Sequence, residues 1–97
     1  MYAAILQMTF PPERRDEVVA FLRDEMTPVI RDNPGFLDFR VLESDTPGTL
    51  VMIDTWESQA DSAAAGQGEA AVAVHGRFDD LKLAVSAATR YTVVSHS

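Results

Sequence analysis

Residues Tyr2 to Phe10 form an almost uninterrupted apolar run, in which Gln7 and Thr9 are the polar exceptions. Pro11 and Pro12 end the run, and its composition predicts a β-strand. A strand that is apolar on both faces is normally buried on both faces. The chain must therefore build a sheet with two covered sides.

A helix is predicted after Pro11 and Pro12, because proline can occupy the first turn of a helix. Its apolar stripe has helical spacing: Val18, Phe21, Leu22, Met26, Val29 and Ile30. Pro28 is expected to bend or loosen the last turns. The segment Asn33-Pro34-Gly35 ends the helix.

The next two predicted strands form an antiparallel hairpin, because only a turn-rich loop separates them. They span Phe36 to Glu43 and Thr49 to Trp56. Ser58 is a good N-cap for a short helix that runs to about Ala65. A second helical stretch is predicted from about Glu69 to Ala87, and a last strand from Tyr91 to Ser95.

This β-α-β-β-α-β order predicts an α+β, ferredoxin-like fold with a four-stranded antiparallel sheet, formed by a single domain over residues 1–97. Helices on one face leave the other face of such a sheet open. That face should be polar in a monomer, yet each predicted strand carries apolar residues on both faces, such as Val51 and Ile53 opposite Leu50 and Met52. We therefore predict a homodimer that pairs these faces.

Charge and composition exclude several classes of function. The chain has 8 basic and 15 acidic residues and a net charge of -7, which argues against binding nucleic acid or an anionic membrane. It has no long apolar run and no recognisable signal peptide. Without cysteine, and without a His cluster at metal-ligand spacing, no metal site is expected. These features favour the cytoplasm.

Two short segments suggest a family. The residues Asn33-Pro34-Gly35-Phe36-Leu37 lead into one strand, and Trp56-Glu57-Ser58 ends another before a helix. In these segments the chain resembles the antibiotic biosynthesis monooxygenase (ABM) family of dimeric α/β-barrel proteins. The resemblance implies either cofactor-free oxidation of aromatic polyketides by dioxygen, or haem binding and degradation. For the haem-degrading branch, Gln7 and Ala65 fall where that branch has Asn and Trp, and His75 falls near its His.

Five residues are the candidates for a site. His75 and Gln7 are the predicted catalytic residues, with His75 as a proton acceptor or an axial ligand and Gln7 as a buried amide that orients the substrate. The candidate substrate-binding residues are Trp56, Phe21 and Phe78. Each has a simpler alternative: His75 as a surface or boundary residue, Gln7 as a hydrogen-bond partner for a backbone group or a partner subunit, and the aromatic residues as core.

The charges of the central hairpin have a structural interpretation. Arg40, Asp38 and Asp54 are predicted to form cross-strand ion pairs, with a functional Arg-carboxylate site as the less favoured interpretation.

Three functions stay open on the sequence alone. The first is a cofactor-independent monooxygenase acting on a phenolic, polyketide-like molecule, in which a base ionises the phenol before dioxygen reacts. The second is a haem-binding protein with His75 as ligand. The third is a non-catalytic dimeric module that binds a small ligand or serves as a scaffold. The expected ligand is a hydrophobic aromatic small molecule.

Overall fold

The computed structural model describes residues 1–97 and contains one four-stranded antiparallel sheet with the strand order β2-β3-β1-β4. The strands are β1 (Tyr2–Thr9), β2 (Phe36–Glu43), β3 (Thr49–Trp56) and β4 (Ala84–Thr92). The first strand is thus central, between β3 and the last strand. The predicted α+β, ferredoxin-like βαββαβ fold is confirmed.

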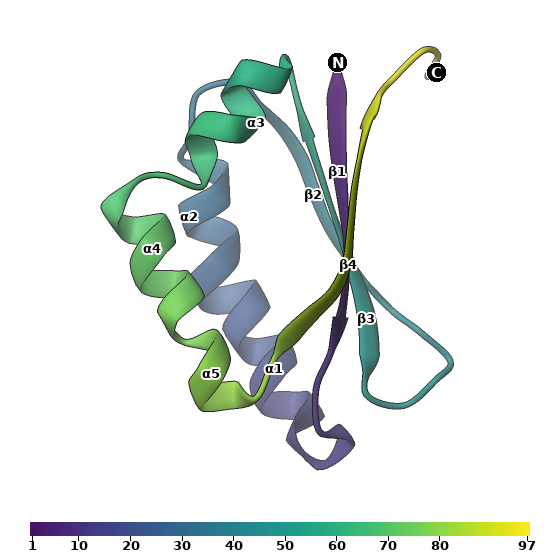
Figure 1. Ribbon diagram of the computed structural model, residues 1–97, viewed down its shortest axis with the longest axis vertical. Coiled ribbons are helices and arrows are strands. Elements are labelled where there is room, and N and C mark those ends of the chain that lie inside the picture. The colour runs from purple at the N-terminus through teal and green to yellow at the C-terminus, as the bar shows by residue number, and fades with distance from the viewer.

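All helices cover one face of the sheet, and the opposite face carries none (Figure 1). The first helical connection joins β1 to β2 and begins with a 3-10 turn (Pro12–Arg14). The helices are α1 (Arg15–Phe21), α2 (Thr27–Arg31), α3 (Gln59–Ala65), α4 (Glu69–Gly76) and α5 (Phe78–Leu81). None of them has the length and hydrophobicity that crossing a membrane requires.

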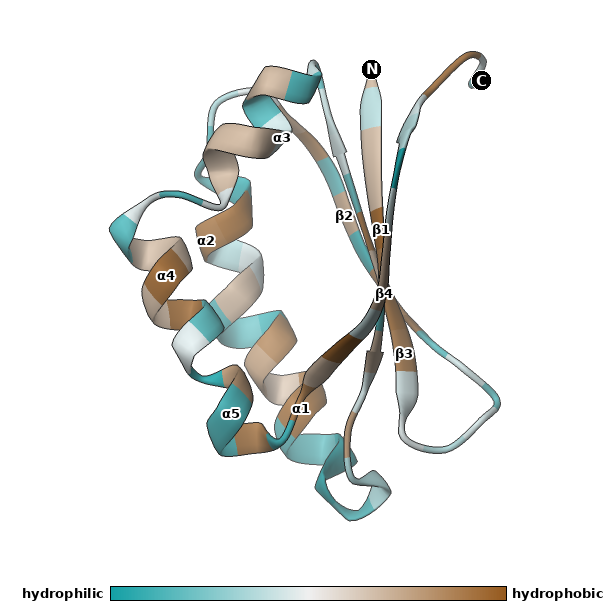
Figure 2. Ribbon diagram, in the orientation of Figure 1, coloured by the Kyte–Doolittle hydropathy of each residue, from teal (hydrophilic) through white to brown (hydrophobic).

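The core lies between the sheet and these helices. Side chains of β1 and β3 that point toward the helices are almost fully buried, among them Met8, Leu50 and Met52. They pack against Phe21 and Leu22 of the first helical connection. Each such side chain contributes roughly 1.5–3 kcal/mol of burial free energy. Brown, hydrophobic stretches occur on the strands and on α2 and α4 of the helical layer (Figure 2).

The other sheet face carries apolar side chains that no helix covers. Ile5 and Ile53 are paired at its centre, and Val51 pairs with Leu42 on the next strand. Leu42 and Tyr91 are 48% and 51% exposed. The prediction of apolar residues on both faces is confirmed for these positions. The register is irregular between Phe36 and Asp38, so Phe36 lies beside Trp56 on the helix side.

Proline 28 coincides with a change of helix type. A π-helical segment (Leu22–Met26) separates α1 from α2, and the Thr27 hydroxyl donates a hydrogen bond to the Leu22 carbonyl at 2.7 Å. Pro28 lacks a backbone N–H, and its ring crowds the preceding turn. The predicted loosening of this helix therefore takes the form of a π-helical turn, a feature frequent at functional sites.

The predicted end of the last helix is wrong. The helix does not reach Ala87: α5 ends at Leu81, and Lys82 adopts a left-handed conformation with φ 54°. The strand then begins at Ala84 and not at Tyr91, so that Val85 pairs with Met8. The alanine-rich composition of residues 84–88 favours helix, but pairing with β1 overrides that preference.

The two family-like segments lie against each other at one end of the sheet. The Glu57 N–H donates to the Gly35 carbonyl at 2.8 Å, and the rings of Phe36 and Trp56 meet edge to face at 5.8 Å. Ser58 caps α3 as predicted, by accepting from the Asp61 N–H at 3.1 Å. Gly35 has φ +78°, and a Cβ there would overlap the Asp61 side chain.

We predict that Gly35→Ala lowers the free energy of unfolding by about 1–3 kcal/mol, because it combines a strained φ with a steric clash. The matched control is Gly76→Ala in α4, where a Cβ would meet no atom within 4 Å. That change should be neutral or stabilising by up to about 1 kcal/mol. Urea denaturation measures both, and equal effects would contradict the role assigned to Gly35.

Candidate functional site

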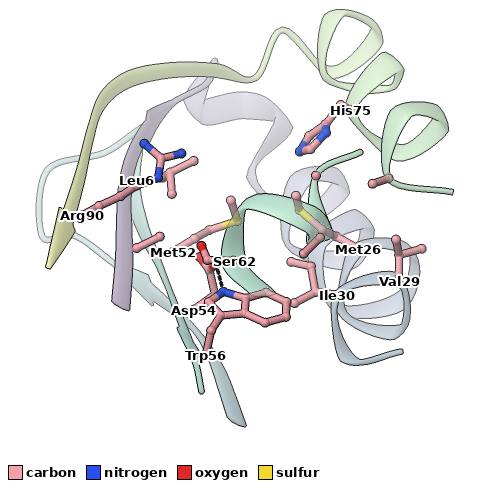
Figure 3. Close-up of a pocket in the computed structure, with 14 residues that line it drawn as sticks. Leu6, Met26, Val29, Ile30, Met52, Asp54, Trp56, Ser62, His75 and Arg90 are labelled. Atoms are coloured by element: carbon pink, nitrogen blue, oxygen red, sulfur yellow. Dashed lines mark hydrogen bonds between the residues drawn. The ribbon is translucent and has the colours of Figure 1, made fainter. Parts of the chain in front are cut away.

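A cavity of about 140 Å³ lies between the helix-facing side of the sheet and the helices. Nine of its 14 lining residues are hydrophobic, including Leu6 and Met52 from the sheet and Met26, Val29 and Ile30 from the π-helical segment and α2. Figure 3 shows these side chains around the same space. Its polar groups are few: Asp54, Ser62, His75 and Arg90.

Small residues create this space. Ala4 lies near one end of the central strand β1, between Asp54 and Arg90 on the neighbouring strands. Helices α3 and α4 contribute Ala65, Gly66 and Ala71 to the opposite wall. A larger side chain at any of these positions would fill part of the cavity. Met8 and Leu50 fill the neighbouring part of the core in this way. The sequence thus leaves a gap at one end of an otherwise close-packed layer.

Trp56 forms a wall of the cavity and is itself almost fully buried, with 1% of its surface exposed. Its Nε1–H donates a hydrogen bond to Asp54 Oδ2 at 2.6 Å, which Figure 3 marks as a dashed line. Trp56 therefore serves as packing and as cavity lining at the same time. The structure places this predicted wall residue at the site.

Asp54 is half-buried beside the indole, on the helix-facing side of β3. Burial raises the pKa of this carboxyl above its ordinary value. The hydrogen bonds from Trp56 and from the backbone N–H of Asp54, and then the positive charge of Arg90, oppose that rise in pKa. Its second oxygen, Oδ1, receives no hydrogen bond from another side chain. A carboxylate in this setting is a stronger base than one in water.

His75 reaches the cavity from α4, on the helix side (Figure 3). The residue is exposed, and its ring meets that of Phe78 edge to face at 5.3 Å. The structure therefore brings His75 and Trp56 together at one site. Both can contact the same small ligand.

The other three predicted site residues lie elsewhere. Gln7 is exposed on the open face, because residues of β1 alternate between the faces and Met8 occupies the helix side. Gln7 therefore does not line the cavity with His75, and its amide is not buried within the single chain. Phe21 and Phe78 pack against each other in the core with ring centroids 5.8 Å apart, and neither lines the cavity.

The charged residues of the hairpin divide between the two faces. Arg40 binds Asp38 of its own strand at 2.8 Å on the open side. Asp54 points the other way into the cavity, so the predicted ion-pair group does not include it. Strand alternation with Met52 and Trp56 was the signal that placed Asp54 under the helices.

Arg90 was missed because the last strand was predicted to begin at Tyr91, the residue after it, whereas β4 begins at Ala84. It stands on β4, where it is the register partner of Ala4, and it forms no ion pair with any carboxylate of the chain. An unpaired guanidinium beside an apolar cavity can bind an anionic ligand.

Metal-ligating side chains do not cluster in this protein: no group of three or more His, Asp or Glu side chains is placed to hold an ion. The cavity offers one imidazole from His75. The positions that correspond to the haem-degrading branch do not all lie at the cavity. Ala65 lines it but lacks the bulk of a Trp, and Gln7 lies on the other side of the sheet.

The family model for antibiotic biosynthesis monooxygenase matches residues 1–77. Among solved structures, a candidate antibiotic biosynthesis monooxygenase from Deinococcus radiodurans superposes with a TM-score of 0.85 at 13% identity, covering 100% of this chain and 96% of that one. SnoaB of Streptomyces nogalater, a cofactor-independent oxygenase, gives 0.79 at 15% identity, with 98% and 94% covered. No curated protein matches the chain.

We predict that Asp54→Asn increases stability at neutral pH, while the Asn side-chain oxygen still accepts from Trp56. The pKa of Asp54 is higher in the folded chain than in the unfolded chain. The folded protein therefore loses stability as the pH rises from the unfolded-state pKa to the folded-state pKa, because the unfolded chain ionises more easily. The extra stability of Asp54→Asn should vanish when the pH falls below 3.8, the ordinary pKa of an Asp side chain. Thermal unfolding over this pH range measures it, and a gain that persists in acid would contradict the cause.

Proposed function

The chain belongs to the antibiotic biosynthesis monooxygenase family, and we propose that it is a cofactor-independent monooxygenase acting on a small phenolic aromatic compound. The observation that carries the proposal is one apolar cavity that contains proton-accepting side chains and a cation. Asp54 and Arg90 lie on its sheet side and His75 on its helix side. Apolar walls with a few convergent polar groups are typical of binding sites for small aromatic molecules.

Cavity size limits the substrate. A volume of about 140 Å³ is close to that of an engineered cavity of about 150 Å³ that holds benzene in another protein. It is well below the roughly 300–1,000 Å³ of sites for drug-sized ligands. A phenol with one ring or two fused rings therefore fits this space, and a larger polyketide would extend beyond the cavity.

The proposed reaction converts a phenol and O₂ into a quinone and water. A base in the site removes the phenolic proton, and the electron-rich ring carbon opposite the oxygen donates electrons to O₂ and forms a carbon–oxygen bond. Protonation gives a hydroperoxide. The O–O bond then breaks, and the ring hydrogen leaves as a proton. One oxygen atom stays as the new carbonyl, and the other departs as water.

Side chains of the cavity match the needs of this sequence. Asp54 and His75 can each accept the phenolic proton. The Trp56 indole offers a flat wall for the ring. The mainly apolar lining favours the uncharged phenol on entry and strengthens electrostatic interactions within the site.

Haem fits this site poorly. The cavity volume is far below what a macrocycle needs, and only His75 of the haem-branch positions brings a ligating side chain to it. A non-catalytic module that binds the same aromatic ligand is the second candidate, because the cavity accounts for binding whether or not oxygen reacts. Oxygen consumption separates that candidate from the monooxygenase.

We also propose that the protein is a homodimer paired through the open sheet face. Ile5, Val51, Ile53 and the half-exposed Leu42 and Tyr91 form an apolar surface that no helix covers. Such a surface favours association with a second copy over contact with water.

The monooxygenase proposal predicts oxygen uptake with one- and two-ring phenols, in a ratio of one O₂ to one quinone. Ala65→Phe fills the cavity and should lower the affinity for these phenols at least tenfold, with a matching loss of turnover. Ala63→Phe is the control, since Ala63 lies on the same helix but is exposed and outside the lining. An oxygen electrode and calorimetric titration provide the measurements.

Phenol binding without oxygen uptake would support the non-catalytic module instead. If Ala65→Phe and Ala63→Phe behave alike, the ligand binds elsewhere and the site assignment fails.

The dimer proposal predicts that Ile5→Lys weakens association at least a hundredfold, equal to about 2.7 kcal/mol, because it buries an unpaired charge at the centre of the paired faces. Val72→Lys is the control, since Val72 is 62% exposed on α4, away from the open face. Sedimentation equilibrium should find two 10.6 kDa chains per particle for the parent protein and the control. A monomeric, well-folded parent at micromolar concentration would overturn the proposal.

A further inference from the structure

We propose that Asp54 is the catalytic residue that accepts the phenolic proton and that Arg90 binds the phenolate thus formed. This inference rests on the proposed function and assigns roles that neither the family resemblance nor the sequence pattern gives. It names the ionised form of a phenol as the species that the site recognises.

The first support is the sheet register. Ala4 of β1 is paired with Asp54 of β3 on one side and with Arg90 of β4 on the other. Neighbouring strands lie about 4.8 Å apart, so the two charged residues flank Ala4 with Cα atoms about 10 Å from each other. Because the Ala4 side chain is only a methyl group, an open floor is left between a carboxylate and a guanidinium.

The second support is the state of the Asp54 carboxylate. Oδ2 accepts from the Trp56 indole at 2.6 Å, which fixes the orientation of the group. Oδ1 has no side-chain donor, so it can accept a proton from a ligand. Partial burial also makes this carboxylate more basic than an exposed one.

The third support is the free charge of Arg90. All of the close ion pairs in the chain involve other arginines, so the exposed guanidinium of Arg90 acts on Asp54 only through its charge and makes no direct ion pair. When the phenol loses its proton, the O–H bond breaks and an O–H bond to Asp54 forms. The negative charge thereby moves from Asp54 to the phenolate, and the net charge of the site is unchanged.

His75 is the rival base, and its surroundings fit the first proton transfer less well. It lies on the helix side, is exposed, and contacts the ring edge of Phe78. The groups that face Asp54 from the packed elements are Arg90 on β4, His75 on α4, Ser62 on α3 and Trp56 on β3 itself. Of these, only Arg90 carries a permanent positive charge.

The test uses 4-nitrophenol, whose ionised form is coloured, and the 97-residue chain. In the parent protein, phenolate binding must be accompanied by proton uptake at Asp54. Its affinity should therefore fall about tenfold per pH unit across the alkaline range in which the free ligand is ionised. Asp54→Asn mimics the protonated acid. It should bind the phenolate at least tenfold more tightly at the alkaline end, with no pH dependence, while phenol turnover is lost.

Arg90→Gln should weaken phenolate binding at least tenfold, in the parent protein and in the Asp54→Asn background alike. Arg40→Gln is the matched control, because Arg40 lies on the open face and pairs with Asp38. It should leave the affinity within twofold. Folding is checked by the fluorescence of Trp56, whose acceptor the Asn variant retains.

A phenolate affinity that does not depend on pH in the parent protein, or that Asp54→Asn leaves unchanged, would overturn the role of Asp54. Loss of affinity in Arg40→Gln equal to that in Arg90→Gln would overturn the role of Arg90, and absence of any nitrophenol binding would overturn both. If binding behaves as expected but no phenol supports oxygen uptake, proton transfer to Asp54 and phenolate binding by Arg90 stand, and the monooxygenase is refuted.

Discussion

The buried N–H of Trp56 is the polar group on which the arrangement of the site depends. An indole that is 1% exposed needs a hydrogen-bond acceptor, and the chain supplies one two residues earlier on the same face of β3. That requirement places a carboxylate inside an otherwise apolar layer. The same indole packs on Phe36 and ends the strand where α3 is capped, so one side chain links the sheet, the helical layer and the chemistry.

The sequence predicts the fold well where local signals and tertiary packing agree. The observed elements agree with the alternation of residues on β3, with the proline-glycine turns and with the Ser58 cap. The π-helical turn is consistent with the loosening expected from Pro28. Agreement fails after Leu81, because alanine-rich residues favour helix while β1 needs a second partner. The left-handed Lys82 that resolves this conflict has no sequence signal of its own, since lysine seldom adopts that conformation.

The site is predictable only in part. His75 and Trp56 could be selected by residue type, and Asp54 by its parity with Trp56. Gln7 was misplaced because a polar residue in an apolar strand can lie on either face, and the open face was its actual position. Arg90 depends on the register of β4, which pairing with β1 sets. It also lies beyond the residues that the family model matches, 1–77, so family membership alone does not indicate it.

The central position of β1 has a consequence for how the chain acquires its structure. One neighbour of β1 is the last strand, and the Ser86 hydroxyl donates to the Gln7 carbonyl across 79 residues of sequence. Contacts of such long range slow folding, because a large loop must close before they form. During synthesis on the ribosome, the apolar β1 therefore emerges long before β4 exists. The nascent chain must keep a hydrophobic strand soluble until translation passes residue 92, and the sheet is completed only then.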